Sequence, residues 1–328
     1  MSRIAGIAAG KPSQAMVVLG ICVVAFAGFS LALPGFLTLG NLFALLRNIS
    51  ILGVLALGMA IVVIARGLDL SQVASVAAST AIAIILMNAG WSTPAALIAG
   101  FFIAVMVGLL NGWLIAVVEM PSLITTLASG LVVLGVTRST AVQHFVVNLG
   151  PGHEDFLRLG GNLPGGVPAP LLVFICMLVL THLLLSRTVP GRFIYAHGDN
   201  PEAARLAGLP TRPLTMLEYA LCAGIGYVGG VVMIAQTALM HLQIVEGTLI
   251  FDVIMVVVLG GVSLTGGRGH VGSVLVGALL IGLLLNGMTI MDMDVQTQNI
   301  VKGVVLLLAI VLDSVLHPRD EETSKQGD

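Results

Sequence analysis

Long apolar runs, separated by short polar segments, make up most of this chain. A helix that crosses a bilayer needs about 20 mostly apolar residues, and ten segments approach that length. They are residues 15–33, 46–65, 70–89, 94–118, 122–142, 168–186, 214–236, 249–264, 270–289 and 299–316. The pattern predicts an all-α integral membrane protein with about ten transmembrane helices in a lipid bilayer.

Two places in this pattern leave alternatives open. Residues 249–264 form a short segment that a glycine-rich loop, 265–269, joins to the next one. The pair is therefore either two full spans or one helix broken at glycines. The first run could also pass for a signal peptide, but it is long for one and has no clean small-x-small cleavage site before Gly35. We expect it to be an uncleaved first helix.

The basic residues predict the orientation, because cytoplasmic segments of membrane proteins are enriched in Lys and Arg. With the N-terminus in the cytoplasm, ten of the 14 basic residues fall on the cytoplasmic side. The four assigned to outer segments are Arg47, Arg138, Arg158 and Lys302. We expect both termini to be cytoplasmic, residues 1–318 to form a single transmembrane domain, and residues 319–328 to form a short cytoplasmic tail. The two long loops are 187–213 on the inside and the Gly/Pro-rich 143–167 on the outside.

Composition excludes other classes of protein. The chain is 57% apolar and 9% charged, with a mean hydropathy of +1.07, whereas soluble domains carry about 25% charged residues. A net charge of −2 gives no reason to expect a nucleic-acid partner. Cys22, Cys176 and Cys222 stand singly in apolar runs, so we expect small buried hydrophobes and no metal site. His153, Glu154 and Asp155 show no recognised catalytic spacing.

A weak internal repeat is visible. Residues 62–71 resemble residues 256–265, residues 73–76 resemble 271–274, and Asn88 corresponds to Asn286. Both copies cross from the inner to the outer side in the same sense, which predicts a parallel repeat of a kind common in transporters. Chance similarity among Val, Gly and Ser is the alternative.

The inner loop contains one short helix with specified ends. Asn200 is a good N-cap, Pro201 suits the first helical position, and Glu202 favours the positive end of the helix dipole. Gly208 supplies a left-handed C-terminal residue, and Pro210 prevents continuation. Such a two-turn helix is too short to be stable alone. It either docks into a partner or is an ordinary capped surface helix.

Polar residues within the apolar runs are few; the main ones are Asn88, Asn111, Gln236, Asp252 and Asn286. For Asn111 and Asn286, hydrogen bonds between helices are at least as strong an interpretation as solute contact. Nothing resembles the chain of carboxylates and histidines that a proton-coupled carrier uses.

Near the inner end of the second run, Asp69 is predicted to pair with Arg66 rather than to carry protons. The chain also has no phosphate-binding GxxxxGK[ST] loop, so ATP hydrolysis would need a separate chain.

Residues 191–209, GRFIYAHGDNPEAARLAGL, resemble the cytoplasmic signature of the ribose-type ABC importer permeases. Three further stretches follow in family order: 57–71, 111–127 and 258–287. The resemblance covers about residues 41–315. The family pattern usually has Gly or Ser where this chain has Arg66, and Val-Gly where it has Gln72-Val73. The second departure puts in doubt the close backbone packing expected where the third helix begins.

The resemblance implies a membrane-spanning permease subunit of an ABC importer for a small sugar, located in the bacterial inner membrane. The implied partners are a cytoplasmic ATP-binding cassette ATPase, an extracytoplasmic sugar-binding protein that would set most of the specificity, and a second permease copy or paralogue. ATP and Mg²⁺ would be used by the ATPase, and no cofactor by this chain. A secondary active transporter of a small polar solute is the alternative.

Two sets of site residues follow from the resemblance. In that family the cytoplasmic loop contacts the ATPase, which makes its helix a coupling helix. The expected coupling residues are Gly191, Arg192, Gly198, Asn200, Glu202, Ala203, Ala204, Arg205 and Gly208. The expected gating or path residues are Asp69, Asn111, Gly260, Gly261, Gly266, Gly267 and Asn286. For the paired glycines, simple tight turning between helices is the alternative to gating.

Overall fold

A computed structural model describes residues 14–142 and 145–316 and contains a helix at each of the ten predicted apolar segments. These helices are α1 (Gln14–Ala32), α2 (Leu39–Ile64), α3 (Gln72–Asn88), α4 (Thr93–Ala116), α5 (Ser122–Thr140), α7 (Ala169–Arg187), α10 (Thr211–Thr237), α11 (Leu249–Gly260), α12 (Val271–Ile290) and α13 (Val295–Leu316). Seven of them, all except α3, α11 and α13, are long and apolar enough to cross a membrane by length and composition. The protein is thus a predominantly helical membrane protein.

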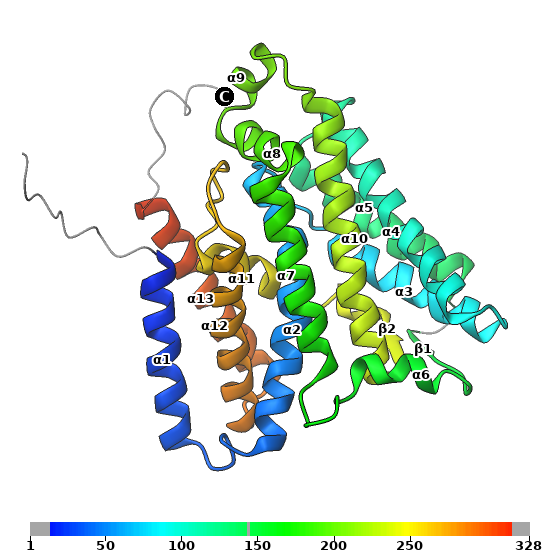
Figure 1. The fold of residues 1–328 in the computed structure, drawn as a ribbon, viewed down its shortest axis with the longest axis vertical. Coiled ribbons are helices and arrows are strands. Elements are labelled where there is room, and N and C mark those ends of the chain that lie inside the picture. The colour runs from blue at the N-terminus through cyan, green and yellow to red at the C-terminus, as the bar shows by residue number, and fades with distance from the viewer. Residues whose placement is uncertain (1–13, 143–144, 317–328) are drawn as a thin grey trace, which may run out of the picture.

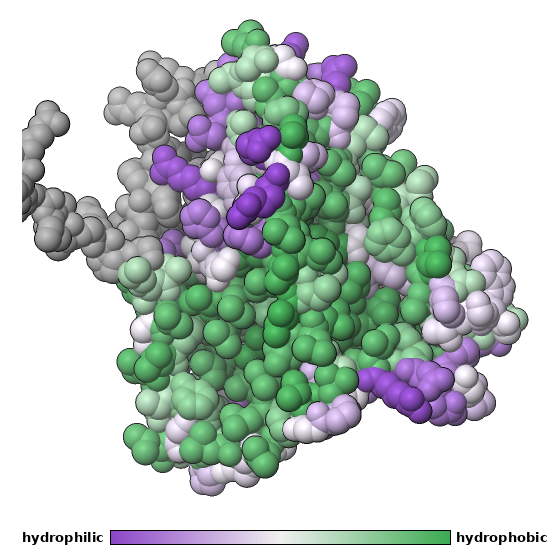
Figure 2. All heavy atoms as spheres, in the orientation of Figure 1, coloured by the Kyte–Doolittle hydropathy of each residue, from purple (hydrophilic) through white to green (hydrophobic). Residues whose placement is uncertain are grey.

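Helix α2 is the centre of the bundle and is buried along nearly its whole length. It packs against α7, α10, α11 and α12, while α10 also packs along α4 (Figure 1). The outer helices α1, α4, α5 and α7 expose many large apolar side chains, and Figure 2 shows them as a broad apolar surface beneath a more polar upper end. Such a surface suits acyl chains and not water.

The two ends of the bundle differ. At the upper end in Figure 1, α9 (Pro201–Leu206) lies beyond the long helices, α8 (Val189–Asp199) lies between it and the end of α7, and the start of α1 and the end of α13 lie toward this end. At the lower end, β1 (Val146–Asn148) pairs antiparallel with β2 (Leu239–His241) beside α6 (Glu154–Leu157). Two short 3₁₀ helices, Arg158–Gly160 and Leu242–Val245, follow α6 and β2.

Several predicted boundaries need correction. Helix α2 begins at Leu39 and not near residue 46, so Arg47 lies inside a helix, where it donates to Asn162 Oδ1 at 2.6 Å. Lys302 likewise lies inside α13, which begins at Val295 and not near residue 299. Polar side chains that find partners do not end a helix, which is why hydropathy alone began both helices too late. The predicted tail, 319–328, lies outside the described residues.

Three further expectations are settled by the coordinates. Helix α11 is short and buried, and it packs beside the full-length α12 after the glycine loop 261–270, so the pair is two separate helices and not one helix broken at glycines. Cys22 and Cys222 are buried as expected. Cys176 is exposed on α7, because that helix presents one face to the outside of the bundle.

Candidate functional site

The long loop 187–213, predicted to be cytoplasmic, is mostly helical. Thr188 caps α8, with its hydroxyl oxygen accepting from the Gly191 amide at 3.2 Å; this helix was not predicted. Asn200 caps α9 by accepting from the Ala203 amide at 2.9 Å, and Gly208 takes a left-handed φ of 81° just beyond its end. The position and caps of α9 are therefore those predicted from local sequence.

Ala204, one of the expected coupling residues on α9, is not available to a partner. Ala204 is buried against its own chain, with 5% of its surface exposed, whereas Leu206 is 89% exposed. Ala203 and Arg205 are exposed beside it, as is Arg192 on α8. The surface that α9 offers to a partner thus centres on Leu206, a residue missed by sequence reasoning because leucine fits any apolar pattern.

Three segments that are distant in sequence meet at the last carbonyl of α2. The amide of Gly267 donates to the Ile64 oxygen at 2.8 Å, satisfying a carbonyl that the helix end would leave unpaired. A Cβ on Gly198 would overlap that same oxygen, and a Cβ on Gly266 or Gly267 would meet α8 backbone at Gly198 or Asp199. Only glycine permits this approach. We call this contact of Ile64, Gly198, Gly266 and Gly267 the α8 junction.

A side-chain contact extends the α8 junction. The Tyr195 hydroxyl of α8 donates to the carbonyl oxygen of Gly269 at 2.7 Å. Burial raises the pKa of Tyr195, which keeps the phenol protonated as a donor. Helix α8 therefore contacts the glycine loop at both its Gly266–Gly267 turn and Gly269. The structure thus brings residues from the predicted coupling set and the predicted gating set into direct contact.

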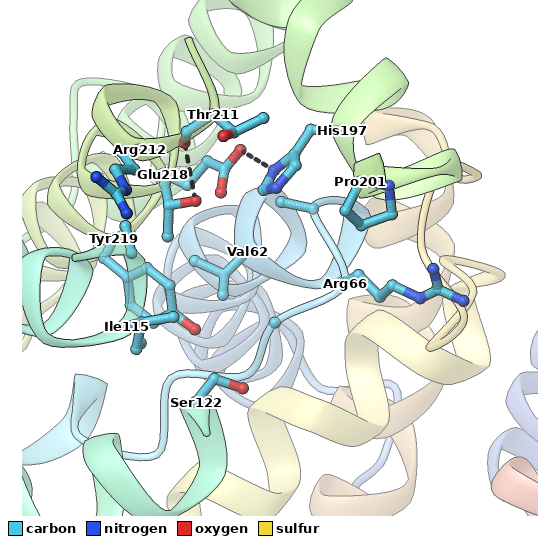
Figure 3. A pocket seen from close by; sticks show the side chains of 14 residues that line it. Val62, Arg66, Ile115, Ser122, His197, Pro201, Thr211, Arg212, Glu218 and Tyr219 are labelled. Atoms are coloured by element: carbon cyan, nitrogen blue, oxygen red, sulfur yellow. Dashed lines mark hydrogen bonds and ion pairs between the residues drawn. The ribbon is translucent and has the colours of Figure 1, made fainter. Parts of the chain in front are cut away.

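A pocket of about 320 Å³ lies beside this junction, between the ends of α2, α4, α8 and α10. In Figure 3 the His197 ring on α8 points toward Glu218 on α10, while Arg66 extends away from that pair. His197 Nδ1 lies 3.2 Å from Glu218 Oε1, and Glu218 is buried. The pair adds a link between α8 and α10. Neither residue stood out in the sequence, since each is a lone polar side chain.

The loop 65–71 between α2 and α3 corrects another expectation. Asp69 does not pair with Arg66: it is buried and accepts from the Ser71 amide at 3.0 Å and the Ser71 hydroxyl at 2.6 Å, while Arg66 is exposed. Asn111 Nδ2 donates to Ser71 Oγ at 2.7 Å. Asp69 and Asn111 are therefore brought together through Ser71. Arg66 takes a φ of 72°, which ends α2 and turns its side chain outward.

The family departure at residue 72 does not loosen the packing. The Gln72 side chain is buried and donates from Nε2 to the Leu55 carbonyl at 2.8 Å. It fills the space left by Gly58 and Gly226 on the two neighbouring helices. Backbone room at those glycines thus accommodates the larger side chain.

The remaining predicted gating residues lie in two places. Gly260 faces the α12 backbone, where a Cβ would overlap the Ser273 carbonyl oxygen, and Gly261 ends α11 with a φ of 99°. Asn286 lies near the other end of α12 and exchanges amide hydrogen bonds with Asn41 at 2.8 and 3.1 Å. Asn286 thus joins two helices, which is one of the two roles considered for it, and it is not part of the α8 junction. The described residues contain no group of three or more His, Cys, Asp or Glu placed to hold a metal ion.

Comparisons with known proteins agree with this architecture. The family model described as a branched-chain amino acid transport system / permease component matches residues 41–310. The ribose import permease of Escherichia coli (strain K12) is 32% identical over 284 residues, covering 86% of this chain and 88% of that protein. An L-arabinose ABC transporter permease of Azospirillum brasilense is 35% identical over 293 residues, with 89% and 85% covered.

A galactofuranose transporter permease of Escherichia coli (strain K12) is 29% identical over 275 residues, covering 84% of this chain and 80% of that protein. The family match spans the central helix α2, the α8–α9 segment and the glycine loop. The chain therefore belongs to the ribose-type family of ABC importer permeases and is a multi-pass transport subunit of the inner membrane.

Proposed function

We propose that this chain translocates a small sugar, delivered by an extracytoplasmic binding protein, under the control of a separate cytoplasmic ATPase that uses ATP and Mg²⁺. Similar proteins are named as permeases for ribose, arabinose and galactofuranose, which supports a pentose or hexose as cargo. Two permease copies, or this chain and a paralogue, enclose the path. Residues 1–318 form the membrane domain with ten spans, and both termini are cytoplasmic, including the tail 319–328.

The observation that carries this proposal is the α8 junction. Helix α9 follows α8 directly through Asn200, and α8 contacts the α2 end and the glycine loop through backbone atoms. Close-packed contacts of this kind leave little room for independent movement. A force on α9 would therefore reach α2 and α12, which suits an ATPase acting on a gate.

Transport itself is tested with the permease, an ATPase and a binding protein reconstituted together in proteoliposomes. We expect ATP-dependent uptake of radiolabelled D-ribose, L-arabinose or D-galactose that vanadate abolishes and a protonophore leaves unchanged. Uptake that survives vanadate but stops with the protonophore would identify a secondary transporter instead. Uptake of L-leucine and of none of the sugars would overturn the substrate class.

Coupling is tested on the exposed side of α9. Replacing Leu206 with Asp removes an apolar side chain worth about 2 kcal/mol when buried at an interface and adds a charge there. We expect the ATPase no longer to co-purify, with the permease itself intact, whereas Leu206→Met keeps the complex. Because Ala204 is buried against its own chain, Ala204→Trp would disturb the permease and is a poor probe. Normal co-purification and uptake with Leu206→Asp would refute the coupling role.

Orientation is tested independently with reporters. A reporter fused after Arg319 should be cytoplasmic, and one inserted near His153 should be extracytoplasmic. Finding both on one side would overturn the span count and the orientation together.

A further inference from the structure

A second cavity, of about 460 Å³, lies between α2, α10, α11 and α12. Asn48 on its wall precedes Ile64 by 16 residues of the same helix, which places it about 24 Å from the α8 junction. Its volume falls within the range of small-molecule sites, roughly 300–1,000 Å³. Six side chains supply most of its polar lining: Asn48, Gln236, Thr237, Asp252, Asn286 and Thr289.

Much of this polar lining is not used within the protein. The side-chain amides of Asn48 and Gln236 make no hydrogen bond to any other described residue. Asp252 is 5% exposed, and its Oδ1 is buried without a partner within the described ranges. A buried polar atom without a partner costs free energy, so Asp252 Oδ1 favours a ligand that donates a hydrogen bond. The Asn48 and Gln236 amides, which are exposed and half-buried, offer such a ligand both donors and acceptors.

The charge of the cavity favours a neutral ligand. Asp252 Oδ2 accepts from Lys302 Nζ at 2.9 Å, and the same ammonium donates to Thr248 Oγ1 at 3.0 Å. Among the described residues, the one charged group on the wall is therefore compensated by Lys302, and the other polar groups are amides and hydroxyls. Leu52, Met233 and Leu285 add apolar surface, which matches the carbon faces of a sugar ring. A zwitterion would need exposed charges of both signs.

From these observations we infer that this cavity binds a neutral monosaccharide within the permease itself, with Asn48 and Gln236 as direct hydrogen-bond partners of its hydroxyls. The inference rests on the proposed sugar transport and adds to it a specificity contribution from this chain. The cavity walls come from both repeat halves, α2 from the first and α11–α12 from the second. Solute sites of transporters commonly lie at such a boundary.

The test is protection of a cysteine from labelling, with the full-length permease in nanodiscs. Thr289→Cys, on the cavity wall but not a proposed hydrogen-bond partner of the sugar, is made in a Cys176→Ser background, since Cys176 is the exposed native thiol, and reacted with a charged methanethiosulfonate reagent. With about 100 mM D-ribose, L-arabinose or D-galactose and a dissociation constant of about 10 mM, labelling should slow about tenfold. L-leucine at the same concentration should have no effect. Ser92→Cys, an exposed position elsewhere, is the control and should not be protected.

Protection by leucine alone, equal protection at both cysteines, or no protection by any of the sugars would each overturn the inference. A second measurement uses the complete transporter: Asn48→Ala and Gln236→Ala should each lower sugar uptake about fivefold, the effect of one lost hydrogen bond, with Ser92→Ala unchanged. The labelling needs no ATPase, so it reports on the cavity even if the proposed importer fails. Conversely, wild-type uptake with unaffected cavity variants would reject the cavity site alone.

Discussion

The loops 65–71 and 261–270 hold corresponding places in the two halves of the chain and share a local design. Helix α2 ends at Arg66, with a φ of 72°, and α11 ends at Gly261, with a φ of 99°. The Gly67 amide donates to the Val62 carbonyl at 2.8 Å, and the Val262 amide donates to the Val257 carbonyl at 3.1 Å. A turn stabilised by Asp69 follows in the first loop, and one stabilised by Ser263 in the second. Asp69 and Ser263 correspond in the predicted repeat, whereas the left-handed residues lie one position out of its register, since the repeat aligns Arg66 with Gly260.

The two loops differ in what holds them. Side chains of the surrounding long helices bind the first loop: Asn111 to Ser71, Thr126 to Leu70 at 3.1 Å, and Tyr219 to Leu68 at 3.3 Å. The second loop is held largely by α8 and the end of α2, through the α8 junction and Tyr195. The first loop is therefore fixed by side chains of the long helices, whereas the position of the second loop depends on α8. We expect variants of the first loop to change stability, and variants of the second to change coupling.

The largest effect is expected at Gly198. In Gly198→Ala the new methyl group would overlap the Ile64 carbonyl, forcing α8 away from α2 and the glycine loop. We expect ATP-driven uptake to fall by more than about tenfold, a change of about 1.4 kcal/mol or more in the driven step, while membrane insertion persists. Gly272→Ala, where a Cβ meets open space, is the matched control. Full transport by the Gly198 variant would mean that the junction carries no force.

The next effect concerns the first loop. Removing the Asn111 side chain deletes its hydrogen bond to Ser71 Oγ, while the bond from Ser71 to Asp69 remains, and such a loss costs about 1–2 kcal/mol. We expect a lower melting temperature. Unfolding is measured in the Cys176→Ser background with a thiol-reactive dye, which reacts with the buried Cys22 and Cys222 only when the protein unfolds. A cycle with Asn111→Ala, Ser71→Ala and the double variant isolates the pair. A coupling energy near zero would show that this hydrogen bond does not hold the loop.

Tyr195 tests whether the second loop follows α8. Tyr195→Phe and Tyr227→Phe each delete one hydroxyl that donates to a backbone carbonyl, Gly269 in the first case and Leu97 in the second. Both should lose about 1 kcal/mol of stability. Only Tyr195→Phe should reduce sugar uptake per ATP hydrolysed, because only that tyrosine contacts the glycine loop. Equal coupling in the two variants would contradict the assignment.

The smallest effect is expected at Arg66. A left-handed conformation costs a non-glycine residue about 1 kcal/mol, so Arg66→Gly relieves strain, while glycine adds a similar entropy to the unfolded chain. We expect a melting temperature within about 2 °C of the wild type and unchanged uptake. Gly261→Ala, the corresponding change in the second loop, should be destabilising. If the two variants behave alike, the helix ends are not equivalent.

Local features were predictable from the sequence. The caps of α9 act between residues three or four apart, so Asn200, Pro201 and Gly208 locate that helix without knowledge of the fold. Apolar run length likewise located a helix at each of the ten segments, seven of them long enough to cross a bilayer. Errors arose where polar residues belong to the first turns of a helix, so α2 and α13 begin earlier than their apolar runs.

Contacts between distant segments could not be read in the same way. Nothing near Gly198 indicates that Ile64 and Gly267 approach it, and nothing near Asn48 indicates that Gln236 lies on the same cavity. Asp69 bonds Ser71 and not Arg66 because helix packing buries one and leaves the other exposed. Spacing along the chain sets hydrogen bonds within a turn and the length of a helix. Which faces meet, and which polar atoms are left for a ligand, depends on how the helices pack against one another.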